Sequence, residues 1–201
     1  KEKYTEKIFQ YFYDLFDQND YNNAYIILFA GKKEEGKNSV INAFFNIIKG
    51  IKLEENKRYV LKSLESNIDN GLHLHYLKDV NNKPIIIINC EGYGEREIKN
   101  DDNINKAFAY MFSYLIKHIN LICYVAKETK EKINIYNRYI FSCFTNLFTE
   151  DFYRNFVIIN TYPNKNTIKE GSKFIESLSN DINFKNIDDK IYTVKITTGT
   201  E

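Results

Sequence analysis

Short, continuous apolar runs alternate along this chain with longer segments in which apolar residues recur every three or four positions. The continuous runs predict buried strands, and the spaced segments predict amphipathic helices. For example, AYIILFA at 24–30 predicts a strand, and KNSVINAFFNIIKG at 37–50 predicts a helix closed by Gly50. The other predicted strands are 72–80, 83–90, 120–126, 155–162 and 190–196, and the other predicted helices are 102–119, 133–148 and about 167–178.

Most of the predicted strands are continuous apolar runs instead of alternating with period two. Strands of this kind, separated by helices, are typical of a parallel sheet that is covered on both faces. Asn81 and Asn82 lie between two consecutive strands and indicate a hairpin, which would be the antiparallel exception. We therefore predict an α/β fold of three layers, α/β/α, around a mostly parallel six-stranded sheet with one antiparallel hairpin strand.

An aromatic stripe precedes the first strand. Residues 4–17, YTEKIFQYFYDLFD, place Ile8, Phe12 and Phe16 at helical spacing. The opposite face is mixed in charge instead of basic, which favours packing on protein over lying on a membrane surface. We expect residues 1–20 to form an amphipathic helix packed on a domain that spans 21–201. A membrane-docked scaffold that uses residues 4–16 stays open as an alternative.

Composition narrows the class of protein. With 201 residues of which 43% are hydrophobic, the chain is long enough for one buried core. Its 28 Lys and Arg against 27 Asp and Glu leave a net charge of +1, so no field attracts nucleic acid, and we expect no nucleic-acid partner. Three cysteines inside apolar segments predict buried thiols in a reducing compartment, and we expect a cytoplasmic protein.

Two histidines also lie on one predicted strand. His73 and His75 are two positions apart, so they would face the same side of the sheet. Since no third ligand is in view, we expect a solvated sheet face there instead of a metal site.

The most specific motif is Gly31-Lys32-Lys33-Glu34-Glu35-Gly36-Lys37, which has the spacing GxxxxGK between a predicted strand and a predicted helix. In that context backbone N–H groups and the helix N-terminus hold phosphate oxygens, and the lysine reaches the outer phosphates. Carboxylates in such a loop repel a triphosphate unless they point outward or neighbouring lysines neutralise them. The candidate phosphate-binding residues are Gly31, Glu35, Gly36, Lys37, Asn38 and Ser39.

The side chains that would handle a magnesium ion depart from this motif. Asn38 stands where a hydroxyl should bind Mg²⁺, and Ser39 follows one position too late. At the end of the strand 83–90, Asn89 stands where a second carboxylate would be expected, with Gly92 in the glycine position of the switch. No threonine occurs between Thr5 and Thr129 to close over a terminal phosphate. We therefore expect Mg²⁺ binding to be weak or absent, with Asn38 as a possible ligand.

At these residues the chain resembles a known family. GKKEEGKNSVINAFF, IINCEGYGE and the segment from LICYVA to NFVIINTY together resemble the septin-like and GIMAP-type branch of the P-loop GTPase superclass, over roughly residues 24–196. CEGYGE is also similar to the switch of guanylate-binding and atlastin-like GTPases, which leaves the branch open. The resemblance implies a Rossmann-like G domain, GTP or GDP with Mg²⁺, and dimerisation across the nucleotide face.

In this family an Asp near the end of the fifth strand reads guanine. The corresponding stretch offers Asn160, Thr161 and Asn164 as base-binding candidates, and the Asp position falls on Pro163 or Asn164 depending on register. An Asn presents one acceptor and one mismatched donor where guanine needs two acceptors. The sequence thus predicts a degenerate, pseudo-GTPase G domain that acts as an interaction module with a protein partner or a second copy. The alternative is a slow GTPase in which Asn38 or Ser39 substitutes as the metal ligand.

Overall fold

The fold is built on one sheet of six strands in the order β2-β3-β1-β4-β5-β6. The computed structural model describes residues 18–52, 54–55, 58–60, 71–90, 92–93, 98–127, 135–148, 154–161 and 192–196. The strands are β1 (Tyr25–Ala30), β2 (Leu72–Lys78), β3 (Pro84–Cys90), β4 (Leu121–Lys127), β5 (Phe156–Thr161) and β6 (Tyr192–Ile196). The helices are α2 (Gln18–Asn23), α3 (Lys37–Ile48), α4 (Ile98–Tyr114) and α5 (Ile135–Leu147).

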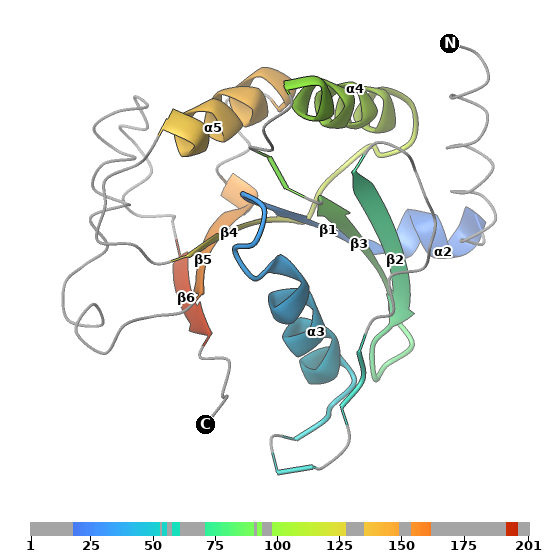
Figure 1. Cartoon of the computed structure of the whole chain (residues 1–201). Coiled ribbons are helices and arrows are strands. Elements are labelled where there is room, and N and C mark those ends of the chain that lie inside the picture. The colour runs from blue at the N-terminus through green and yellow to red at the C-terminus, as the bar shows by residue number, and fades with distance from the viewer. Residues whose placement is uncertain are drawn as a thin grey trace.

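All neighbouring strands run parallel except β2 and β3, which form the antiparallel hairpin. Asp79 shapes the turn, because its carboxylate accepts hydrogen bonds from the backbone N–H groups of Asn81 and Lys83, both at 2.8 Å. Figure 1 shows α4 and α5 on one face of the sheet and α3 on the other. The predicted three-layer α/β fold with a mostly parallel sheet is confirmed.

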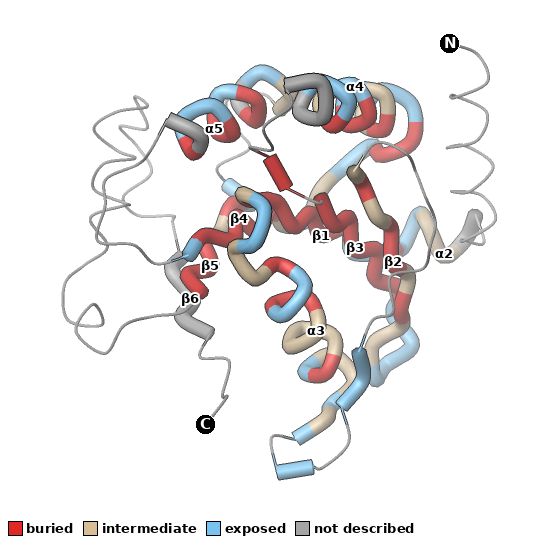
Figure 2. The backbone as a smooth tube through the Cα atoms, in the orientation of Figure 1, coloured by how far each residue is buried: buried red, intermediate tan, exposed pale blue. Residues whose placement is uncertain are grey.

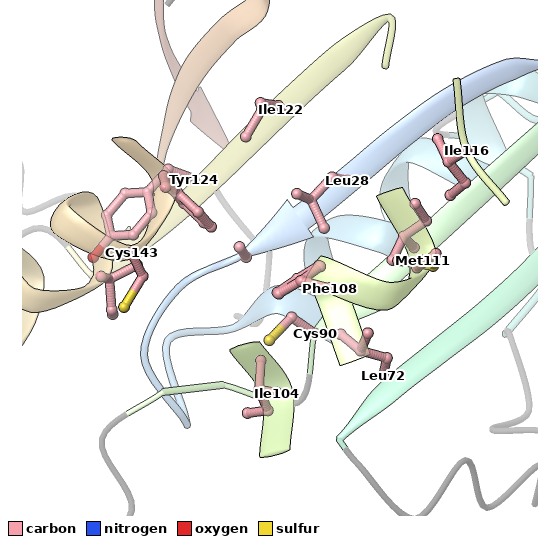
Figure 3. Close-up of a cluster of buried hydrophobic side chains, with 14 of the residues drawn as sticks. Leu28, Leu72, Cys90, Ile104, Phe108, Met111, Ile116, Ile122, Tyr124 and Cys143 are labelled. Atoms are coloured by element: carbon pink, nitrogen blue, oxygen red, sulfur yellow. The ribbon is translucent and has the colours of Figure 1, made fainter. Parts of the chain in front are cut away.

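Burial on both faces explains why the central strands are almost continuously apolar. In β1, Ile26 and Leu28 pack in the cluster that faces α4 and α5, whereas Ile27 and Phe29 pack in the cluster that faces α3. Figure 2 shows the central strands buried along their length, and Figure 3 shows Leu28 and Phe108 of α4 within the first cluster. Each successive side chain of the strand thus loses contact with water, which stabilises the fold whichever face it points to.

The ends of α4 differ from the prediction of 102–119. The helix begins at Ile98 and stops at Tyr114, and the amides of Leu115 and Ile116 both donate to the carbonyl of Met111. Leu115 and Ile116 are nevertheless buried, so a turn places them in the core. Their apolar spacing continued the helical pattern, although their backbone does not. The predicted helices at 4–17 and about 167–178 lie outside the described residues.

Two smaller expectations have different outcomes. Cys90, Cys123 and Cys143 are buried thiols, as predicted, and burial raises the pKa of the Cys123 thiol to about 12. The solvated histidine face is wrong for His75, which is 7% exposed because the edge strand β2 turns that side chain inward. Burial lowers the pKa of His75, and the neighbouring His73 acts in the same direction.

Helix α2 lies against the edge strand β2 across the boundary that we predicted between residues 20 and 21. The Tyr76 hydroxyl donates to the Asp20 carboxylate at 2.5 Å, and Lys78 pairs with the same carboxylate at 3.0 Å. The Tyr21 hydroxyl donates to the carbonyl of Leu115. These contacts hold α2 on the domain. Of the helices that the structure describes, none has the length and apolar character needed to span a membrane.

The packing of α4 gives a test of the core. Replacing the fully buried Phe108 with alanine removes its ring from the α4 side of the sheet, and we expect a loss of roughly 3–5 kcal/mol in the free energy of unfolding. Tyr114, which lies in the same helix and is 68% exposed, is the matched control, and Tyr114→Ala should cost less than about 1 kcal/mol. Urea denaturation of the three proteins measures the difference, and equal losses would contradict this assignment of the core.

Candidate functional site

The phosphate-loop sequence folds into a tight connection between β1 and α3 at the carboxyl edge of the sheet (Figure 1). Gly31 has φ 146, and a Cβ atom there would lie 2.2 Å from the carbonyl oxygen of Val125 in β4. Gly36 caps α3 in the left-handed conformation with φ 85. Both glycines of the motif are therefore required by the backbone, the first by close approach and the second by its conformation.

Lys37 begins α3 and directs its ammonium group back beneath the loop. The side chain is 5% exposed, and its Nζ donates to the carbonyls of Lys32 at 2.7 Å and Gly31 at 3.3 Å. A buried ammonium group is costly unless it is hydrogen-bonded or paired. The loop carbonyls supply those bonds, and they hold the positive charge at the place where the motif predicts phosphate.

The two amides predicted on the magnesium side meet each other. Asn89 Nδ2, at the end of β3, donates to Asn38 Oδ1, in the first turn of α3, at 3.0 Å. Asn89 is 7% exposed, and its Oδ1 is buried without a hydrogen-bond partner in the part of the chain that the structure describes. The fold therefore brings these two positions together, and a hydrogen bond between neutral groups joins them. Ser39, the other candidate ligand, lies exposed on the next position of α3.

The switch segment after β3 also lies on the loop. Lys32 and Tyr93 form a parallel bridge, in which the Lys33 amide donates to the Tyr93 carbonyl and the Tyr93 amide donates to the Gly31 carbonyl, both at 3.3 Å. A Cβ added to Gly92 would lie 2.6 Å from the Lys33 nitrogen. Gly92 is thus a glycine because the loop approaches it closely, and apart from the glycine itself no sequence signal predicts this contact.

Glu35 connects the loop to strands β4 and β5 instead of pointing away from the protein. Its carboxylate accepts a hydrogen bond from the Lys127 amide at the end of β4 at 2.9 Å, and its carbonyl accepts one from the Thr161 hydroxyl in β5 at 2.7 Å. Burial raises the pKa of the Glu35 carboxyl, although the Lys127 hydrogen bond and the charges of Lys37 and Lys32 act in the opposite direction. A partly buried negative charge therefore lies within the phosphate loop.

The base-binding candidates are only partly described. Asn160 is 2% exposed, and its Nδ2 is buried with no hydrogen-bond partner among the described residues. The Thr161 hydroxyl donates to the Glu35 carbonyl of the loop. Asn164 lies outside the described residues. The structure therefore brings Thr161 to the phosphate loop and leaves the guanine-reading prediction untested. Within the described ranges, no group of three or more His, Cys, Asp or Glu side chains could hold a metal ion.

No protein-family model matches the chain. No curated protein matches it either. Among solved structures, Toc33 from Arabidopsis thaliana in complex with GDP and Mg²⁺ aligns with a TM-score of 0.59 and 16% identity over 99% of this chain and 80% of that chain. A dimerisation-deficient variant of Toc33 aligns with a TM-score of 0.60 and 16% identity over 98% and 79%.

A further structure concerns the chloroplast translocon components atToc33 and psToc159, for which dimerisation is described as important for GTPase activity. It aligns with a TM-score of 0.60 and 20% identity over 100% of this chain and 79% of that chain. At these identities the likeness is one of fold. Together with the strand order and the loop between β1 and α3, it shows that the chain has the fold of a P-loop GTPase G domain.

The position of Glu35 predicts a pH-dependent effect of one substitution. Because the folded chain raises the pKa of this carboxyl, the contribution of Glu35 to stability is present at acid pH and is lost as the pH rises through the folded pKa. Glu35→Gln keeps an acceptor for the Lys127 amide without the charge, so we expect it to raise the melting temperature at pH 7, by an amount that shrinks as the pH falls through the carboxyl range.

Thermal melts of both proteins across pH measure this effect. Glu34→Gln is the matched control, since Glu34 is exposed in the same loop, and it should change the melting temperature little at any pH. A Glu35→Gln difference that stays constant from acid to neutral pH would show that the carboxylate is not penalised by burial.

Proposed function

We propose that this chain is a degenerate G domain, a pseudo-GTPase whose phosphate loop binds guanine nucleotide weakly and without dependence on Mg²⁺, or not at all, and which acts as an interaction or assembly module. The observation that carries the proposal is the hydrogen bond between Asn38 and Asn89 on the magnesium side of the loop. Within the P-loop GTPase superclass, the motifs of the loop, the switch and the fifth strand favour the septin-like and GIMAP-type branch for this domain.

The parts of the site that hold phosphate are retained. Gly31 and Gly36 allow the backbone to turn, Lys37 supplies a positive charge, and α3 begins directly after the loop. The first amides of a helix attract anions, because they carry partial positive charge and have no partner within the helix. This geometry favours residual binding of a phosphate tail.

The parts that would hold magnesium are changed. Mg²⁺ prefers carboxylate, hydroxyl and phosphate oxygens in an octahedron, and it neutralises charge that develops during phosphoryl transfer. Two neutral amides offer less negative charge to a cation than a hydroxyl and a carboxylate, and Asn38 Oδ1 already accepts a hydrogen bond from Asn89 Nδ2. The Toc33 structures contain Mg²⁺ with GDP and with GMPPNP, so the likeness in fold gives no support to a loss of the metal, and the proposal rests on these two side chains.

A partner is proposed on the same basis. One of the Toc33 structures is of a dimerisation-deficient variant. For atToc33 and psToc159, dimerisation is described as important for GTPase activity. We extend this to a homodimer, or a complex with another protein, across the nucleotide face of the present chain. The same structures favour the second candidate function, a slow GTPase that uses Asn38 or Ser39 as a substitute ligand.

Calorimetric titration of the purified chain with GTP and GDP, with and without Mg²⁺, tests the proposal. We expect dissociation constants weaker than about 1 μM that do not change with Mg²⁺. Tight, Mg²⁺-dependent binding would overturn it. Phosphate release from GTP that exceeds the release by Lys37→Ala would favour the slow GTPase instead.

Restoring the magnesium-side groups gives a second, sharper prediction. The double variant Asn38→Ser with Asn89→Asp replaces the amide pair by a hydroxyl and a carboxylate, and we expect GDP affinity to gain at least about tenfold in the presence of Mg²⁺ but not in its absence. Asn38→Ser alone is the control, because it leaves the amide at position 89. If the double variant shows no response to Mg²⁺, the amide pair is not what limits metal binding.

A further inference from the structure

We propose that Gly92 and Tyr93 occupy the place of a third phosphate, so that this loop accepts a diphosphate tail and rejects a triphosphate. The inference rests on the proposed nucleotide binding at the loop and goes beyond it, because it names the tail that the site takes. It depends on three features of the switch segment: its backbone pairing with the loop, the position of Gly92 beside Lys37, and the burial of Tyr93.

The backbone pairing is an extension of the sheet beyond the ends of β1 and β3. Within the strands Phe29 pairs with Asn89, but the bridge beyond them joins Lys32 to Tyr93, three residues on from Phe29 and four on from Asn89. The pairing is therefore offset by one residue between the strands and the bridge, and Gly92, directly before Tyr93, has a positive φ of 127. At the bridge the Lys33 and Tyr93 amides make their two hydrogen bonds.

Gly92 blocks one approach to the lysine. A Cβ built on Gly92 would lie 2.8 Å from Lys37 Nζ, which is the distance at which a charged oxygen would bind an ammonium group. A phosphate oxygen in that direction would therefore overlap the Gly92 backbone. The Lys33 amide, which points to the same side of the loop, already donates to the carbonyl of Tyr93.

The ring of Tyr93 holds the segment in place. Tyr93 is fully buried, its hydroxyl donates to Asn105 Oδ1 of α4 at 3.1 Å, and its ring packs edge-on against Tyr139 and Phe144 of α5. Opening the segment for a terminal phosphate would break two backbone hydrogen bonds and strain this buried contact. The switch is therefore closed by the core and not by a ligand.

The N-terminus of α3 is the proposed place of the inner phosphates. Among the described residues α3 has no side-chain cap hydrogen bond, so its first-turn amides, from Asn38 onward, keep their polarity directed at the loop. In the proposed arrangement the two inner phosphates bind at this helix N-terminus, and the third would meet Gly92 and Tyr93.

Calorimetric titration of the full chain with GDP and with GMPPNP, repeated with pyrophosphate and tripolyphosphate, measures the preference with and without the base. We expect GDP to bind at least about tenfold more tightly than GMPPNP, and pyrophosphate more tightly than tripolyphosphate. In Tyr93→Ala the ratio should fall toward one through a gain in triphosphate affinity. Tyr93→Phe, which keeps the buried ring and the backbone bridge, should retain the preference.

Amide-resolved hydrogen exchange of the unmodified chain gives a readout that does not depend on a variant. We expect the amides of Lys33 and Tyr93 to be protected both without ligand and with GDP. Fast exchange at both amides, GMPPNP binding equal to or tighter than GDP binding, or an unchanged ratio in a folded Tyr93→Ala would each overturn the inference.

Two other outcomes separate this inference from the proposed function. If neither tail binds, the assignment of a diphosphate is overturned, whereas a pseudo-GTPase without nucleotide still stands. If the preference for diphosphate is found together with tight, Mg²⁺-dependent binding, the proposed function is overturned and the closed switch stands.

Discussion

The site depends on one close contact, the approach of the Gly31 backbone to the Val125 carbonyl in β4. A Cβ at Gly31 would lie 2.2 Å from that oxygen, so only glycine lets the loop settle onto the edge of the sheet. Once the loop is seated there, Glu35 reaches the Lys127 amide and its carbonyl reaches Thr161. The loop is thereby fixed to β4 and β5 on one side and to Tyr93 on the other.

The fold could be predicted from sequence because strands buried on both faces appear as continuous apolar runs. In a strand such as β3, which is buried along its length, consecutive side chains face apolar surroundings on both sides of the sheet. Ile therefore occurs at four successive positions, and the sequence shows no period-two alternation. The pattern failed at a turn that follows a helix and at one position of an edge strand. Leu115 and Ile116 lie beyond α4, and His75 faces inward from an edge strand, because tertiary packing and not local spacing decides these positions.

The site could be predicted in part, for a similar reason. The spacing of Gly31, Gly36 and Lys37 follows from the backbone geometry of one short loop. A motif this local can be recognised from sequence alone. The pairing of Asn38 with Asn89 and the bridge from Lys32 to Tyr93 join segments more than fifty residues apart. The hydrogen bonds of the bridge join backbone groups that every residue has, so the side chains of Lys32 and Tyr93 do not predict it. Only Gly92, where the loop leaves no room for a Cβ, marks it in the sequence.

The amide at position 89 and the closed switch support each other physically. A carboxylate in place of Asn89, which is 7% exposed, would be a nearly buried charge that needs a cation beside it. An amide needs no cation and can bond to Asn38, so the edge of the sheet keeps its shape without metal. The segment that follows can then rest on the loop and anchor Tyr93 in the core, since no ion or terminal phosphate has to be admitted there. The loop carbonyls bond to Lys37 and the Lys33 amide bonds to Tyr93, so part of the polar groups of the loop are satisfied within the chain, in keeping with the interaction module proposed above.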